Sequence, residues 1–132
     1  MAYSYKKGTT AMSNLEKMCN YSKPYGCSVE ATLAVIGGRW KPVILFQLLG
    51  GRVLRFSKLR SQVPGITQRM LTKQLRDLER DGVVSRKIYP EVPPRVEYKL
   101  TAYGVTLKPI LLEMRNWGAI HMTKDTSTSN TA

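Results

Sequence analysis

The chain has 132 residues, of which 42% are hydrophobic, so it can form one domain around a modest core. Its formal net charge of +12 favours a polyanion as the partner, with an acidic membrane surface as the alternative. No apolar run is long enough to span a bilayer and no signal peptide is visible, so we expect a cytoplasmic protein without a membrane partner.

Candidate metal ligands and catalytic residues are few. The two cysteines, Cys19 and Cys27, do not have the spacing of a zinc motif, and His121 is the only histidine. The sequence offers no plausible nucleophile and orienting residue for a catalytic set built on His121. It also contains no glycine-rich loop of the kind that binds phosphates. We therefore expect no metal, no cofactor and no enzymatic activity. A permanent disulfide is also not expected in the cytoplasm.

Positive charge is concentrated inside the chain rather than in a tail. No aspartate or glutamate occurs from Ala31 through Arg76. The basic residues of this stretch are Arg39, Lys41, Arg52, Arg55, Lys58, Arg60, Arg69, Lys73 and Arg76. A block of one sign within a folded region indicates a preformed positive surface.

The first part of the chain predicts an extension followed by helices. Residues 1–11 are polar and unpatterned, and we expect them to be disordered. Residues 12–122 are predicted to form a single domain, which begins with a short helix over Met12–Tyr21. Ser28 is predicted to cap the next helix, Ser28–Ile36.

The middle of the chain has the order of a helix-turn-helix. A helix over Lys41–Leu49 is apolar on nearly all sides, which predicts that it is buried. Leu54–Gln62 is predicted to be a short helix, and Pro64–Gly65 form a turn. A basic helix follows over Ile66–Gly82, with Thr67 as its N-cap.

This basic helix has two unlike sides. Leu71, Leu75 and Leu78 fall on one side, and Arg69, Lys73, Arg76 and Arg80 fall on the other. The basic residues begin at the positive end of the helix dipole, and acidic residues crowd its negative end. Both placements oppose the dipole, so the helix loses roughly 0.3–1 kcal/mol of stabilisation for each charge. A negatively charged partner at the first half would account for this arrangement. From this stretch alone, a solvated amphipathic helix is an equal alternative.

Two strands and a long helix complete the domain. Val83–Ile88 and Val96–Leu100 are strand-like, and the loop between them contains three prolines. A stiff basic hairpin after a recognition helix can act as a wing on DNA, although an ordinary hairpin explains it equally well. Thr101 is predicted to cap a helix to Met122, which packs with the first helices within the chain or in a dimer. Residues 123–132 are expected to be a disordered tail.

The chain resembles the HxlR-type winged helix-turn-helix regulators, which are relatives of the MarR-type group. The matching segments are C-S-V-E-A-T-L at Cys27, I-G-G-R-W at Ile36, R-F-S-K-L at Arg55, G-I-T-Q-R-M-L-T at Gly65, L-R-D-L-E-R-D-G at Leu75, P-P-R-V-E-Y-K-L-T at Pro93 and W-G at Trp117. The resemblance implies a mainly α-helical fold with a small β-wing and helical dimerisation elements at both ends. It also implies a homodimer that binds operator DNA, with repression as the commoner mode.

The resemblance further implies a sensor cysteine, because several members of the family sense oxidants or electrophiles at the position of Cys27. The family motif usually continues with proline, whereas Ser28 follows here. A thiolate just before a helix is favoured by the dipole, which is compatible with a sensor; a small buried cysteine is the alternative. Cys19 could serve as a resolving partner.

The helix-turn-helix suggests which side chains contact DNA. Gln68 suits adenine, Arg69 suits guanine, and Thr72 suits a thymine methyl group or a phosphate. Thr67 lies at the start of the same helix. Lys73 and Arg76 could reach bases or phosphates. The residues expected to hold the DNA backbone are Arg55, Lys58 and Arg95.

Two other functions remain open from the sequence. One is a regulator that responds to a small ligand between the dimer helices, without cysteine chemistry. The other is an architectural basic protein that binds DNA without regard to sequence. Such a protein would share the charge and the fold but would not need Gln68 and Thr72 beside the arginines.

Overall fold

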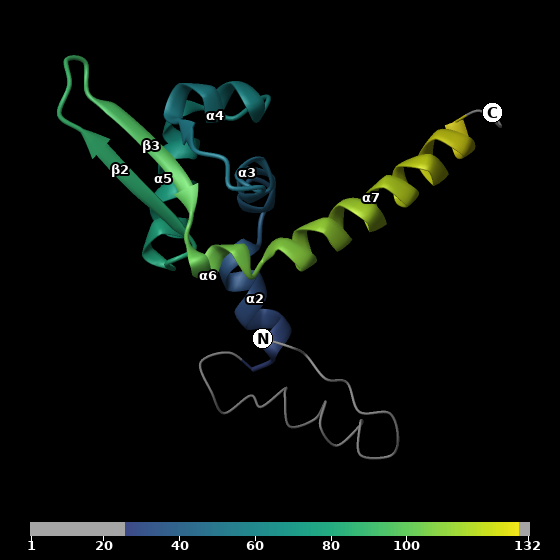
Figure 1. Cartoon of the computed structure of the whole chain (residues 1–132). Coiled ribbons are helices and arrows are strands. Elements are labelled where there is room, and N and C mark those ends of the chain that lie inside the picture. Colours follow the sequence, from purple (N-terminus) through teal and green to yellow (C-terminus); the bar gives the residue numbers. More distant parts are fainter. Residues whose placement is uncertain (1–25, 130–132) are drawn as a thin grey trace.

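The computed structural model describes residues 26–129, with side chains described up to residue 124. The predicted extension, the predicted helix Met12–Tyr21 and Cys19 lie outside this range. The elements in order are α2 (Ser28–Ile36), α3 (Lys41–Gln47), β1 (Leu54–Arg55), α4 (Phe56–Gln62), α5 (Gln68–Arg80), β2 (Val84–Tyr89), β3 (Arg95–Leu100), α6 (Ala102–Val105) and α7 (Lys108–Ser129) (Figure 1). Within residues 26–129, no helix has the length and apolar character needed to cross a membrane.

The fold is mainly helical with one small antiparallel sheet, as predicted. The strand order is β1-β3-β2, and β2 and β3 form the hairpin of the wing. The predicted helix Leu54–Gln62 is wrong in its first turn, because Leu54 and Arg55 form a strand that pairs with Tyr98 and Glu97 of β3. This pairing depends on a chain segment more than forty residues away, so no local pattern in the sequence predicts it.

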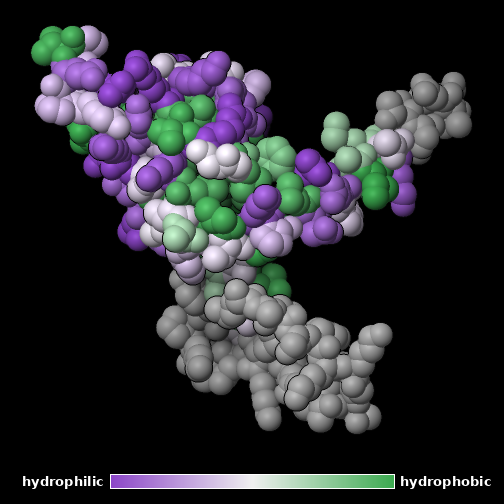
Figure 2. Space-filling view, viewed as in Figure 1, coloured by the Kyte–Doolittle hydropathy of each residue, from purple (hydrophilic) through white to green (hydrophobic). Residues whose placement is uncertain are grey.

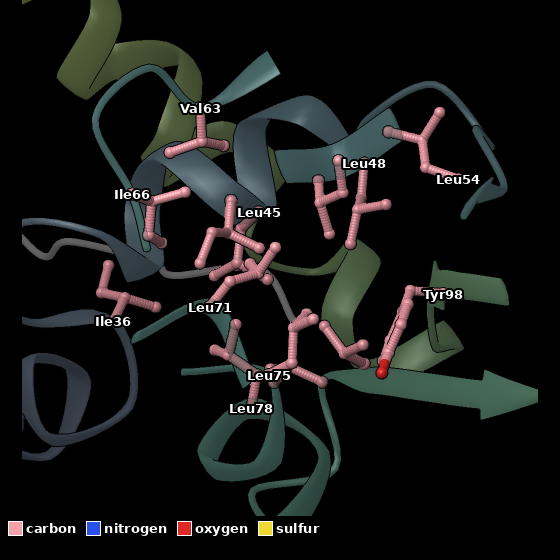
Figure 3. Packing of buried hydrophobic residues seen from close by; sticks show 14 of the residues in the cluster. Ile36, Leu45, Leu48, Leu54, Val63, Ile66, Leu71, Leu75, Leu78 and Tyr98 are labelled. Carbon is pink, nitrogen blue, oxygen red and sulfur yellow. The ribbon is translucent and has the colours of Figure 1, made fainter. Parts of the chain in front are cut away.

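The hydrophobic core lies between α3, α4, α5 and the sheet. The predicted apolar side of the basic helix is confirmed, since Leu71, Leu75 and Leu78 are almost completely buried. Ile44, Leu45 and Leu48 of α3 are also fully buried, as the all-round apolar pattern predicted. Figure 3 shows the leucines of α5 facing Leu45 and the aromatic ring of Tyr98 closing one side.

The helix ends follow the sequence in most places. The Thr67 hydroxyl accepts a hydrogen bond from the Met70 N–H at 3.1 Å, so Thr67 is the N-cap of α5 as predicted. Gly82 follows the helix with a φ of 77°, a conformation that glycine adopts without strain. The cap predicted at Ser28 is wrong by one residue, because Cys27 occupies the N-cap position of α2 and makes no side-chain cap hydrogen bond.

The predicted last helix is two helices, α6 and α7, with a break at Thr106 and Leu107. Pro109 has no N–H to donate to the carbonyl of Val105, which prevents a continuous helix here. The α7 helix continues to Ser129, past the expected end at Met122. Leu111 near the start of α7 is buried, and the C-terminal part of the helix projects away from the body of the molecule (Figure 1).

Gly104 allows α6 to pack closely on the start of the sheet. The Thr101 hydroxyl accepts from the Gly104 N–H at 2.9 Å and donates to the Gly82 carbonyl at 2.6 Å. A Cβ atom on Gly104 would overlap the carbonyl oxygen of Val83, which is a backbone atom and cannot turn away.

We expect Gly104→Ala to lower the free energy of unfolding by ~1–3 kcal/mol, as overpacking does elsewhere. Val105→Ala, an exposed position of the same helix, is the matched control and should stay within ~0.5 kcal/mol of the wild type. Chemical denaturation of both variants measures this difference. Equal stability of the two variants would contradict the close contact.

Candidate nucleic-acid interface

The helix-turn-helix consists of α4, a tight turn and α5. Gly65 in the turn has a φ of 86°, and the Ile66 N–H donates to the Val63 carbonyl at 3.3 Å. Val63 and Ile66 are buried, so the turn is fixed to the core on its inner side. The ring of Trp40, which packs against the core, lies 3.8 Å from the position of a Cβ on Gly65 and supports the turn. This geometry presents the first turn of α5 to solvent.

The exposed side of α5 carries the predicted DNA-contacting residues together. Gln68, Arg69, Lys73 and Arg76 are exposed, as is the N-cap residue Thr67. These five residues line one open, shallow groove, together with Met70, Thr72, Asp77 and Arg80. The structure therefore brings the predicted residues of this helix onto a single surface.

Thr72 is only partly exposed, and its hydroxyl donates to the Gln68 carbonyl at 2.8 Å. This internal bond uses the hydroxyl proton, but both the hydroxyl lone pairs and the side-chain methyl group remain for a partner. Thr72 therefore stays a predicted DNA contact, although its hydroxyl proton is already used in the hydrogen bond to the Gln68 carbonyl.

The acidic residues at the end of α5 have structural partners. Asp77 lies 3.6 Å from the Lys41 Nζ and 3.3 Å from Arg80, and Glu79 lies 3.5 Å from the Arg86 guanidinium. These ion pairs compensate for the unfavourable position of the acids at the negative end of the dipole. In the part of the chain that the structure describes, no carboxylate lies within 4.0 Å of Arg69, Lys73 or Arg76. The unpaired positive charge is therefore concentrated in the first two and a half turns of α5.

The α4 helix adds a second basic edge. Arg55 and Lys58, both predicted to hold the DNA backbone, are exposed. A second hollow lies between α4 and α5 and is lined by Ser57, Arg60 and Ser61 as well as Gln68. Arg60 belongs to the basic block of the sequence but is not among the predicted DNA contacts. The one-turn spacing of Ser57, Arg60 and Ser61 on α4 is the signal that could have identified this edge.

Arg95 at the exit of the wing loop is enclosed by its own hairpin. Its guanidinium lies 3.3 Å from Glu91 and 3.5 Å from Glu97, and it stacks on the Tyr89 ring at 4.0 Å from the centroid. The Nε atom is buried and makes no hydrogen bond within the described residues. The predicted role of Arg95 as a phosphate contact stays a prediction, but the structure shows that its charge is already shared by two carboxylates.

The wing is attached to α5 through charged and aromatic contacts. Arg86 of β2 pairs with Glu79 of α5, and Tyr98 of β3 lies buried beside Phe56, with 6.5 Å between ring centroids. Burial raises the pKa of the Tyr98 hydroxyl, and Glu79 also raises it, whereas Arg86 and Arg76 act in the opposite direction. The phenol therefore stays neutral at physiological pH. Because Tyr98 is buried, the wing packs into the same core as α5.

Cys27 is partly buried at the N-terminus of α2. It is disulfide-bonded, which departs from the expectation of reduced cysteines, and its partner lies outside the described residues. Cys27 directly precedes α2, a helix that lies away from the wing tip (Figure 1).

Large apolar side chains are exposed on α2 and α7. Val29 and Leu33 project from α2, and Met114, Trp117 and Ile120 project from α7. Trp117 keeps 69% of its surface exposed and stacks on His121 with 5.0 Å between ring centroids. Figure 2 shows apolar side chains gathered where α7 leaves the body. Several large apolar side chains exposed on two helices are typical of a surface that binds a partner.

The chain is similar to known transcription regulators along most of its length. Residues 35–126 match the model of the HxlR-like helix-turn-helix family. The chain is 56% identical over 93 residues to the HTH-type transcriptional regulator YdeP of Bacillus subtilis (strain 168), a match that covers 70% of this chain and 72% of YdeP.

Solved structures of the redox regulator HypR are similar as well. The oxidised form matches with a TM-score of 0.67 and 53% identity, covering 70% of this chain and 95% of HypR. The reduced form matches with a TM-score of 0.69 and 49% identity, covering 75% of this chain and 97% of HypR. The winged helix-turn-helix geometry and these similarities agree, and the chain belongs to the HxlR-like helix-turn-helix family of DNA-binding transcription regulators.

Proposed function

We propose that the protein is a homodimeric, sequence-specific regulator that binds operator DNA in the cytoplasm and represses transcription, under the control of Cys27. The observation that carries the DNA-binding part is the unpaired positive surface on the first half of α5, directly after the helix-turn-helix turn. A stable helix gains nothing from that arrangement by itself, whereas a helix that meets DNA gains attraction to phosphates and bases.

Base recognition is assigned to the start of α5. Gln68 and Arg69 occupy its first turn and are exposed, which suits bidentate bonds to adenine and guanine in the major groove. Thr67 and Thr72 would contact a neighbouring base or phosphate, and Lys73 and Arg76 extend the surface along the groove.

Backbone contacts are assigned to α4 and its N-cap. Arg55 and Lys58 are exposed, and Arg60 opens onto the hollow between α4 and α5. Cations at this place would hold the phosphates that border the major groove while α5 reads the bases.

A dimer explains the exposed apolar side chains of α2 and α7. These helices lie away from the wing tip, so pairing through them leaves both α5 helices free (Figure 1). Two recognition helices spaced by roughly 34–36 Å would read successive major grooves of a near-palindromic operator. A dimer placed across a promoter would exclude the polymerase, which gives repression.

Control by Cys27 is supported by its disulfide and by its place at the start of α2. The bond forms when Cys27 and a second thiol, on the same or the other subunit, transfer two electrons to an oxidant and release two protons. Because α2 belongs to the proposed dimer interface, a change there would alter the distance between the two α5 helices. The similarity to HypR in oxidised and reduced forms supports this part of the proposal.

We expect Arg69→Ala to weaken binding to the best operator by ~1–3 kcal/mol and to relax the preference at one base position. The operator is first selected from a random DNA library, and binding is then measured on a panel of single-base variants. Lys58→Ala is the contrasting variant: it should weaken all sequences alike and lower the slope of log K against log salt by ~0.9 for each lost phosphate contact. A uniform loss from Arg69→Ala would make Arg69 a phosphate contact, and wild-type binding without any preference would favour an architectural protein.

We expect Trp117→Glu to convert the dimer into a monomer, because a buried unpaired carboxylate at the interface is costly. Sedimentation at several concentrations measures the mass, and Val53→Glu, another exposed apolar position, should leave the mass unchanged. A dimeric Trp117→Glu protein would place the interface elsewhere.

We expect a thiol oxidant to change the operator affinity of the wild type by ~5- to 150-fold, the usual range of a coupled site, and to leave Cys27→Ser unaffected. Cys19→Ser is measured beside it to identify the second thiol. A full oxidant response in Cys27→Ser would remove the sensor role and favour a ligand site between the dimer helices.

A further inference from the structure

Arg39 is a positive charge beside the recognition helix to which the proposed function gives no role. It belongs to the acid-free basic block, its side chain is exposed, and it makes no ion pair with a described residue. Its guanidinium carbon lies over the Trp40 ring, 4.3 Å from the ring centroid. A guanidinium that rests on an aromatic ring keeps the N–H groups at its edge available to another partner.

Trp40 holds this guanidinium beside the turn that begins α5. The same ring lies 3.8 Å from the position of a Cβ on Gly65 and packs against the core. Gly65 stands just before the N-cap of α5. One aromatic ring therefore contacts both the Arg39 guanidinium and the turn, so the position of Arg39 is tied to the start of the recognition helix.

The start of α3 lies along the flank of α5 that is opposite the wing. Lys41 Nζ lies 3.6 Å from Asp77, which lines the groove on α5 together with Met70. Glu79, which pairs with Arg86 of the wing, lies on the other flank, because residues two positions apart are roughly 160° apart around a helix. None of the cations that the proposed function assigns to DNA belongs to α3 or to the residues directly before it.

We propose that Arg39 binds a phosphate of the operator on the α3 flank of the recognition helix, and that Trp40 is the positioning residue that holds the guanidinium there. This inference rests on the proposed operator binding. Phosphates border the major groove on both sides, and contacts to them fix the register of a protein on the duplex. Because Arg39 and the first turn of α5 are joined through one ring, the phosphate contact would set where Gln68 and Arg69 meet the bases.

The first test replaces single phosphates of the selected operator with neutral methylphosphonates. Arg39→Gln should bind the unmodified operator roughly 2- to 30-fold more weakly, the range of two exposed ion pairs in a dimer. One phosphate position in each half-site should then lose its effect on binding in Arg39→Gln, while the other positions keep theirs. A pattern identical to that of the wild type would overturn the inference.

Arg115→Gln is the matched control for this test. Arg115 is also an exposed arginine that lies over an aromatic ring, 6.0 Å from the Phe46 centroid, but it belongs to α7 and lines neither groove beside α5. Both variants lose one positive charge in each subunit. The slope of log K against log salt should fall by ~0.9 for each subunit in Arg39→Gln and keep the wild-type value in Arg115→Gln. Equal slopes in the two variants would reduce Arg39 to a contribution to net charge.

The role of Trp40 is tested with two substitutions. Trp40→Phe retains a ring beneath the guanidinium, so the phosphate position assigned to Arg39 should keep its effect on binding. Trp40→Leu removes the ring, and that single position should lose its effect, as in Arg39→Gln. Weaker binding of Trp40→Leu with every phosphate position unchanged would make Trp40 a support of the turn alone and overturn its positioning role.

The inference and the proposed function fail in different ways. If the wild type selects no preferred sequence from the random library, the sequence-specific function is overturned, and the slopes of Arg39→Gln and Arg115→Gln on random duplex DNA still decide the role of Arg39. If a specific operator is bound and Arg39→Gln keeps the wild-type slope and phosphate pattern, only the inference about Arg39 is overturned.

Discussion

The burial of one face of α5 sets the position of the whole surface proposed to bind DNA. Leu71, Leu75 and Leu78 are almost fully enclosed by α3 and the sheet, which fixes the rotation of the helix about its own axis. Once that rotation is fixed, the exposed side of the helix carries Arg69, Lys73 and Arg76. The Thr67 cap and the glycine turn then fix where the helix begins, so that its first turn is the part most open to a partner. The burial of the apolar face of α5 therefore determines the direction in which its polar face points.

Ion pairs divide the charges of the helix into two groups. The acids in its last turns are used inside the protein: Asp77 binds α3 through Lys41, and Glu79 binds the wing through Arg86. These contacts explain why acids persist at the unfavourable end of the dipole, since each one attaches a neighbouring element to α5. Arg69, Lys73 and Arg76 in the first turns make no ion pair in the described chain, so their charge does not stabilise the fold and is available to the proposed DNA partner. In the same way Arg95, which looks like a DNA contact from its position after the loop, is enclosed by Glu91, Glu97 and Tyr89.

Local patterns in the sequence predicted the features that depend on neighbouring residues. The caps at Thr67 and Thr101, the apolar stripe of α5 and the two wing strands are each determined within one or two turns, and the structure confirms them. The errors lie where distant segments decide. Leu54 and Arg55 form a strand because they pair with the edge of β3. The ion pairs of Arg95 could not be predicted either, because they need Glu91 of the folded wing loop and Glu97 of β3 to approach its guanidinium; its contact with DNA stays a prediction. The disulfide of Cys27 also could not be read from spacing, because a pair of cysteines has no signature comparable to a metal motif.

The arrangement of α2, α3 and α5 gives a short physical route between Cys27 and the recognition helix. Cys27 begins α2, and at the other end of that helix a Cβ on Gly37 would collide with the backbone of Leu33, so the chain turns tightly toward α3. Trp40, just before α3, supports the turn at Gly65, and Lys41 reaches Asp77 in α5. In the proposed control by Cys27, a movement of α2 would reach the start of α5 through Trp40 and its later turns through Lys41, because only residues 37–39 separate α2 from Trp40. Contact alone does not amount to coupling, which requires two discrete arrangements of α2 that differ in free energy between the disulfide and thiol states. A disulfide at the N-cap of α2, a helix whose last residue Ile36 is buried in the core, is well placed to create them.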